Sequence, residues 1–156
     1  IPRQFRAAVQ DGVEGSASGG ALAGYPVVGV RALVTGGAFV SAESTEGAFA
    51  AAAAKAFRLC VEQAGMTLLE PWMRFEVITP EAHLGDVLSD LNGRRAQISD
   101  QALRSGVHVL GGKVPLSEMF GYATALRSLT QGRATFTMEP TGYLPVPEEI
   151  ARTIIL

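Results

Sequence analysis

The sequence predicts an α+β protein in which a ferredoxin-like β-α-β-β-α-β domain is preceded by an incomplete α/β half-domain. Three observations lead to this fold class. In the second half of the chain, strand-like and helix-like apolar patterns follow one another in that order. In the first half, two helix-like segments enclose one hairpin-like stretch, which supplies too few strands for a closed core. A hydrophobic content of 47%, against 18% charged residues, is sufficient to bury a core.

The first half begins with a segment expected to be helical over residues 2–13, which the glycines at 15, 19 and 20 weaken in its second half. A turn-rich bridge from Leu22 to Pro26 leads into a β-branched run over residues 27–34, which is typical of a strand. Gly36 and Gly37 then supply a tight reversal into a short second strand, residues 38–42.

The next segment is a long helix that Ser44 or Thr45 can cap and that ends at Gly65. Its apolar residues recur at steps of three and four and predict one buried stripe, made by Phe49, Ala53, Phe57, Cys60, Val61 and Ala64. One hairpin cannot cover this stripe, so either the missing strands precede Ile1 in a longer protein, which we favour, or the stripe packs elsewhere. We place a domain boundary here, which gives domains 1–65 and 66–156.

In the second half, the alternation from Met73 to Ile78 predicts a strand, followed by a cap at Thr79-Pro80. A helix follows that runs out near Arg95, and its buried face is made by Leu84, Val87, Leu88 and Leu91. A second strand starts at Gln97-Ile98, and a third contains Val107, Val109 and Val114.

The last two elements are a helix from Leu116 to about Thr130, which Gly132 ends, and a fourth strand over residues 134–138. Met119, Phe120, Ala123 and Leu126 are expected to face inward from this helix. This order predicts a four-stranded antiparallel sheet with both helices on one face, while the other face is free to meet another domain or a partner.

Composition and motifs argue against an enzyme. The net charge is −2, so any contact with nucleic acid must come from a local cluster of cations. Gly111-Gly112-Lys113 lacks the spacing of a phosphate-binding loop and is interpreted as the start of a strand. With His83 and His108 as the only histidines and Cys60 as the only cysteine, neither a serine-type triad nor a zinc site is expected. We predict no catalytic, cofactor or metal site in this chain.

Two arginine clusters and one glycine-led tip remain as candidate sites. Arg94 and Arg95 can either cap a helix end or bind RNA phosphates. The segment from Arg127 to Arg133, which includes Ser128 and Gln131, can either cap a helix or present donors to an RNA loop. The tip is either a plain connection or a slender element that enters a groove, and it is formed by Gly36, Gly37, Phe39 and Val40.

At these residues the sequence resembles elongation factor G and its paralogues. Two segments, VPLSEMFGYAT (residues 114–124) and LRSLTQGRATF (126–136), resemble the signature of the family's fifth domain. LAGYPVV (22–28), LLEP (68–71) and the stretch from Gly85-Asp86-Val87 to Arg94-Arg95 match the family as well. The resemblance implies that residues 1–65 are the later part of a domain IV and that residues from Met66 onward are a domain V.

The resemblance also implies a function. The parent protein is expected to be a cytoplasmic GTPase that binds GTP in N-terminal domains absent here and supports translocation of tRNA and mRNA on the ribosome. Arg127, Ser128 and Gln131 would face the sarcin–ricin loop beside the GTPase-associated centre. Arg94 and Arg95 would contact rRNA nearby, and the tip would enter the decoding site.

The tip departs from the family pattern. Typical translocases carry a histidine where this sequence has Val40, and an acidic residue where it has Gly36. A histidine can donate hydrogen bonds to RNA, whereas valine cannot. The alternatives are therefore a paralogue that acts in ribosome recycling, or a stand-alone ferredoxin-like domain that binds a protein or a small ligand.

Overall fold

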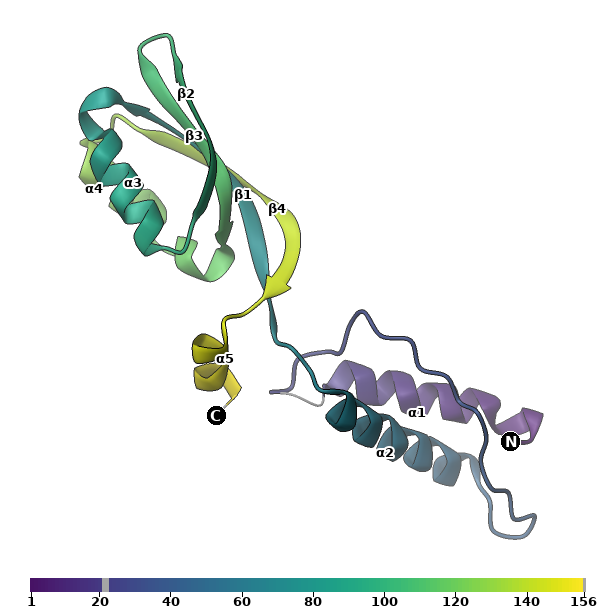
Figure 1. The fold of residues 1–156 in the computed structure, drawn as a ribbon. Helices are drawn as coiled ribbons and strands as arrows, with labels where there is room; N and C mark the ends of the chain where they lie inside the picture. Colours follow the sequence, from purple (N-terminus) through teal and green to yellow (C-terminus); the bar gives the residue numbers. More distant parts are fainter. Residues whose placement is uncertain (21–22, 156) are drawn as a thin grey trace. The chain divides into compact units, whose positions relative to one another are not determined.

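The computed structural model describes residues 1–20 and 23–155 (Figure 1). By their contacts these residues form two units, a sheet unit of residues 69–146 and a helical unit of residues 1–68 with the C-terminal residues from Pro147. The predicted division between residues 65 and 66 stays a prediction. Leu22, the first residue of the predicted bridge, lies outside the described residues.

The sheet unit has the predicted β-α-β-β-α-β order. Its strands lie in the order β2-β3-β1-β4, and every neighbouring pair is antiparallel. Helices α3 and α4 lie on one face of the sheet (Figure 1). The elements are β1 (Leu69–Pro80), η2 (Glu81–His83), α3 (Leu84–Gly93), β2 (Gln97–Arg104), β3 (Val107–Pro115), η3 (Leu116–Met119), α4 (Tyr122–Thr130) and β4 (Thr135–Pro145). The α+β fold class is confirmed.

The core of the sheet unit lies between the sheet and these two helices. Residues of β1 and β3 that point to one face pack against the inward faces of α3 and α4, since side chains alternate along a strand. The buried cluster is Met73, Phe75, Val77, Val87, Leu91, Leu110, Val114, Met119, Tyr122 and Leu126. The opposite face of the sheet carries charged residues, including an ion pair between Arg74 and Glu139.

The glycine pair of β3 has a packing role. Gly111 and Gly112 lie within the strand rather than at its start, beside an irregularity in the pairing between Ile98 and Asp100. A Cβ atom at Gly112 would lie 2.2 Å from the carbonyl oxygen of Gln97, so only glycine fits this close approach of two backbones.

The predicted cap at Thr79-Pro80 is wrong. Thr79 is a fully buried residue of β1, and Pro80 precedes η2 without any side-chain capping bond. His83 is only partly exposed, and its buried Nε2 has no hydrogen-bond partner among the described residues.

The predicted helix from Leu116 to Thr130 is also wrong in its first part. The chain forms the 3-10 helix η3, turns at Gly121 with a φ of 74°, and only then enters α4 at Tyr122. This turn changes the phase of the apolar pattern. Phe120 and Ala123 are exposed although they were expected inside, and Tyr122 is buried instead.

The helical unit contains η1 (Arg3–Phe5), α1 (Arg6–Gly19) and α2 (Glu46–Ala64), and α5 (Glu148–Ile155) is grouped with it. Helix α1 continues through Gly15, which corrects the expectation that its glycines weaken it. Another glycine of α1, Gly12, has a packing role, because a Cβ atom there would lie 2.2 Å from the carbonyl oxygen of Ala50 on α2. Two helices can approach this closely only without a side chain between them.

Helix α2 starts and ends as predicted. The Thr45 hydroxyl accepts a hydrogen bond of 3.1 Å from the amide of Ala48, and Gly65 follows the last residue with a φ of 76°. The predicted stripe is only partly buried: Cys60 and Ala64 are exposed, which was not expected. The small core of this unit consists of Phe5 of η1, Val9 of α1 and Phe49 of α2.

The strands predicted at residues 27–34 and 38–42 are wrong for this structure. The chain between Pro26 and Val40 is irregular, and no element of it pairs as a strand with any described residue. A β-branched run cannot form a ladder without a neighbour to accept its hydrogen bonds, and Val28, Leu33 and Val34 are instead exposed.

Helix α5 was not predicted, although Pro147 followed by Glu148 and Glu149 is a typical helix start. Among the described helices, none combines the length and the apolar character needed to cross a membrane.

Candidate nucleic-acid interface

The C-terminal end of α4 forms a tight turn that exposes several polar side chains. Gln131 and Gly132 follow the helix with φ angles of 53° and 76°, and the amide of Gly132 donates a 2.9 Å hydrogen bond to the carbonyl of Arg127. Thr130 is fully buried and holds the turn from below. Its hydroxyl donates to the carbonyl of Leu126 at 2.7 Å and accepts from the amide of Ala134 at 3.2 Å.

The structure brings together the sequence-predicted residues of this segment on the surface. Arg127, Ser128, Gln131 and Arg133 are all exposed, because the buried face of α4 is made by other residues. Within residues 1–20 and 23–155, neither arginine takes part in an ion pair. No Asp or Glu occurs between Glu118 and Glu139 in the sequence. Two free guanidinium groups beside a hydroxyl and an amide can bind phosphate oxygens.

Arg95 lies at the other end of the sheet unit's helical layer and is turned inward. It has a φ of 59° and follows the C-terminus of α3. Its guanidinium donates to both carboxylate oxygens of Glu70, at 2.7 and 2.9 Å, and to Glu118 at 2.9 Å. The hydrogen bonds to Glu70 raise the pKa of Arg95 further above its ordinary value, and Glu118 adds to this against the opposing effect of burial.

Arg94 is likewise engaged within the protein. Its guanidinium donates to Asp90 at 2.8 Å and to the carbonyl of Glu118, and it lies 5.1 Å from the centre of the Tyr122 ring. Together Arg94 and Arg95 tie the end of α3 to β1 and η3. An RNA phosphate at this place would have to compete with carboxylates already bound, so the rRNA role of this pair stays a prediction.

The tip residues lie in the irregular segment before α2. Phe39 packs partly inward, with its ring centre 5.8 Å from that of Phe5, and Gly37 lies close to the side chain of Ile1. The amide of Val40 donates to the Ser44 hydroxyl at 3.0 Å. The exposed surface of the tip is therefore backbone and apolar side chains, including part of the Phe39 ring, without a side-chain donor or acceptor from residues 36–40.

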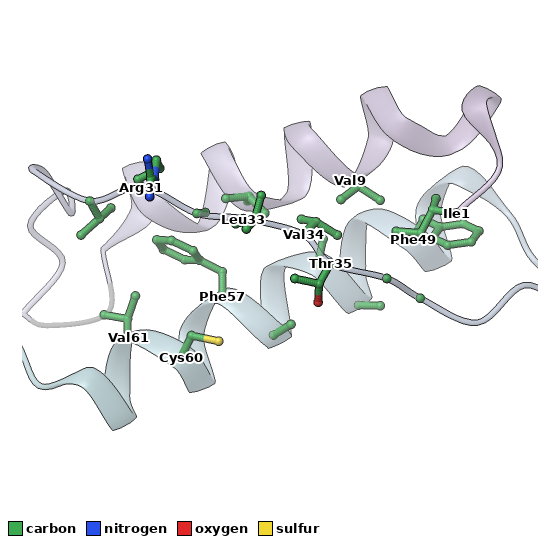
Figure 2. Close-up of a pocket in the computed structure, with 18 of the residues that line it drawn as sticks. Ile1, Val9, Arg31, Leu33, Val34, Thr35, Phe49, Phe57, Cys60 and Val61 are labelled. Atoms are coloured by element: carbon green, nitrogen blue, oxygen red, sulfur yellow. The ribbon is translucent and has the colours of Figure 1, made fainter.

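A cavity of about 610 Å³ lies between the irregular segment and the helices α1 and α2. Figure 2 shows Phe57 and Val61 of α2 directed toward the segment that carries Arg31 to Thr35. Most of its lining is aliphatic or aromatic, and it holds no acid–base or nucleophile–base pair. No cluster of three or more metal-ligating side chains occurs among the residues that the structure describes.

Sequence reasoning missed the exposure of Phe120, because it assumed an unbroken helix there. The signal that could have found it is Gly121, since glycine is the residue that most readily adopts a positive φ.

Two family models match the chain. The model described as "Elongation factor G, domain IV" matches residues 1–65, and the model described as "Elongation factor G C-terminus" matches residues 67–154. Together they cover almost all of the sequence and leave no long unmatched insertion.

Curated relatives agree with these matches. The chain is 48% identical over 155 residues to elongation factor G of Thermotoga maritima and 45% identical to that of Salinibacter ruber, and each match covers 99% of the chain and 22% of the relative. A crystal structure of a Thermus thermophilus protein superimposes with a TM-score of 0.85 at 37% identity, over 99% of this chain and 24% of that one. The chain thus spans about a fifth of the length of the curated relatives it matches.

Proposed function

Because the chain belongs to the elongation factor G family, we propose that it is the ribosome-binding C-terminal module of a GTPase that moves tRNA and mRNA during protein synthesis. The family assignment supports a role as part of a translation elongation factor. GTP would be bound and hydrolysed by N-terminal domains outside this chain. The module itself would position the factor on the ribosome rather than carry out chemistry.

The observation that supports this proposal is the turn at the end of α4. Its two arginines are exposed and have no carboxylate partner in the described structure, in a chain whose net charge is negative. Arginine's planar guanidinium group matches phosphate geometry, and the neighbouring Ser128 and Gln131 can add hydrogen bonds to an unpaired loop. The RNA would be the sarcin–ricin loop, next to the GTPase-associated centre.

The test uses the full-length protein that contains this chain. Replacing Arg127→Ala together with Arg133→Ala should lower ribosome-stimulated GTP turnover and weaken binding to ribosomes. Each lost phosphate contact should also reduce the slope of log K against log salt by about 1. The readouts are GTP turnover against ribosome concentration and affinity measured at several salt concentrations.

A matched control is Arg58→Ala with Arg104→Ala, which removes the same charge from two exposed positions outside the turn. The control should behave as the parent protein. Unchanged turnover and an unchanged salt slope in the Arg127/Arg133 variant would exclude this turn as an RNA contact.

A second candidate is a paralogue that acts in ribosome recycling. It is favoured by the tip, where Val40 and two glycines offer no side-chain hydrogen bond to a decoding site. The same full-length protein can be assayed for movement of mRNA and for subunit splitting, and splitting without movement would select this candidate. The stand-alone binding domain loses support, since the likeness covers 99% of the chain within proteins several times its length.

A further inference from the structure

Phe120 is the most exposed large apolar side chain of the described sheet unit, with 78% of its surface accessible. Two residues close to it in sequence are buried instead. Met119 and Tyr122 are buried in the core, with 5% and 1% of their surface accessible. A single exposed apolar residue is ordinary on a protein surface, but one held between two core anchors is fixed in place.

The backbone on both sides of Phe120 is held by hydrogen bonds. Before it, the carbonyl and the carboxylate of Glu118 accept from Arg94 and Arg95. After it, Gly121 takes a positive φ, and its carbonyl accepts 3.1 Å hydrogen bonds from the amides of Thr124 and Ala125. The positive φ is what breaks the helical phase and leaves the ring outside. The ring is therefore presented from a fixed backbone, so that little conformational entropy would be lost on binding.

The surroundings of Phe120 favour a polyanion as its partner. From Met119 to Met138 the sequence has no acidic residue, and the carboxylate of the preceding Glu118 is paired with Arg95. The exposed side chains that follow Phe120 are Ala123, Thr124, Arg127 and Ser128 of α4, and then Gln131 and Arg133 of the arginine-bearing turn. Aromatic rings and arginine guanidinium groups are the side chains that proteins use to bind unstacked nucleotides.

We propose that Phe120 is a stacking site for an unpaired nucleobase of the same RNA whose phosphate Arg127 contacts. The proposal rests on the proposed function, because it assumes that the α4 turn binds RNA. Arg127 is seven positions after Phe120: the five steps from Tyr122 rise about 7.5 Å within α4, and the two non-helical steps before Tyr122 add at most about 7 Å. A span of at most about 15 Å corresponds to about four stacked nucleotides. One RNA loop can thus reach both ends of α4.

Stacking and phosphate binding differ in their dependence on salt, and the experiment uses this difference. Affinity of the full-length protein for purified ribosomes is measured with a non-hydrolysable GTP analogue between about 50 and 200 mM salt. Phe120→Ala should weaken binding about 10-fold and leave the salt slope unchanged. Arg127→Ala should reduce the slope by about 1. The matched control is Tyr143→Ala, which removes another exposed aromatic ring and should not alter affinity.

Two further variants separate stacking from simple apolar contact. Phe120→Trp should bind at least as tightly as the parent protein, while Phe120→Leu should be as weak as Phe120→Ala, because leucine has no flat ring to stack. Acylation of rRNA 2′-hydroxyl groups should then show one nucleotide that the parent protein protects and Phe120→Ala does not. Thermal melting should show that all five variants fold, as expected for exposed positions.

Parent-like affinity of Phe120→Ala, with Arg127→Ala weakened, would overturn the stacking site and leave the proposed function standing. Parent-like affinity of Phe120→Leu would also overturn it, since an apolar contact with a ribosomal protein would then suffice. If Phe120→Ala and Arg127→Ala both bind as the parent protein does, the stacking site and the proposed RNA contact fail together.

Discussion

In the sheet unit every strand pairs with a neighbouring strand, whereas the β-branched run over residues 27–34 of the helical unit pairs with no strand among the described residues. The same contrast appears in the packing. Ten residues form the buried cluster of the sheet unit, while Phe5, Val9 and Phe49 form that of the helical unit among the described residues. Beside the smaller core lies an apolar cavity of about 610 Å³.

The difference follows from how each kind of element forms its backbone hydrogen bonds. A helix makes its hydrogen bonds within itself, so α1 and α2 form even where little else covers them. A strand depends on a partner. The β-branched pattern of residues 27–34 therefore indicates a capacity for pairing, and only the presence of a neighbouring strand turns this capacity into structure.

The largest expected effect comes from removing one large buried side chain from each of the two cores. Phe75→Ala should lower the free energy of unfolding of the sheet unit by about 3–5 kcal/mol, because Phe75 is almost completely buried. Phe49→Ala should cost the helical unit about half as much, since Phe49 already borders an open cavity and loses fewer contacts. Urea denaturation followed by fluorescence of Trp72, the sole tryptophan, reports on the sheet unit, and amide exchange of α2 reports on the helical unit.

Equal losses from the two substitutions would contradict the comparison, because they would mean that the helical unit has a core as well packed as that of the sheet unit. Phe39→Ala serves as a control, since this ring is partly exposed and should cost less than either.

Much of the sheet unit could be predicted because its apolar spacing and its strand partners lie within the same short stretch of sequence. The pattern from Met73 to Ile78 and that from Leu84 to Leu91 each gave the right element and the right buried face. Phe120 could not be placed, because one left-handed residue at Gly121 overrides helical spacing.

The candidate site was predicted in part. The exposed turn from Arg127 to Arg133 lies where its glycine and hydroxyl residues suggested. The partners of Arg95 could not be foreseen, because Glu70 and Glu118 are each more than 20 residues away in sequence and meet only in the fold. Spacing predicts neighbours on one element, whereas ion pairs between elements depend on the tertiary structure.

A second prediction tests how dry the core of the sheet unit is. Burial, and secondarily the charge of Asp90, raises the pKa of Tyr122 from 10.0 to about 12. Below about pH 10 the hydroxyl is protonated in both states, but from pH 10 to 12 the unfolded chain ionises while the folded chain keeps its proton. The free energy of unfolding should therefore fall across this window, by on the order of 2–3 kcal/mol.

Tyr122→Phe should remove this alkaline loss, and denaturation at a series of pH values would measure it. At neutral pH the substitution should cost little, since the Tyr122 hydroxyl is buried without a hydrogen-bond partner in the described structure. Tyr143→Phe is the matched control, and because Tyr143 is exposed, its pH profile should follow that of the parent chain. The same slope in Tyr122→Phe and the parent would show that water reaches the core.

The smallest effects, but the only ones of opposite sign, are expected in α1. Alanine normally stabilises a helix interior by about 0.5–1 kcal/mol over glycine, and Gly15→Ala should do so, because nothing lies within 4 Å of its added Cβ. Gly12→Ala should instead destabilise by about 1–2 kcal/mol, because its Cβ would meet the backbone of Ala50 and push α1 and α2 apart. Amide exchange of α1 measures both changes. If both substitutions stabilise the protein, α1 and α2 are not in contact. The helical unit would then lack even its small core.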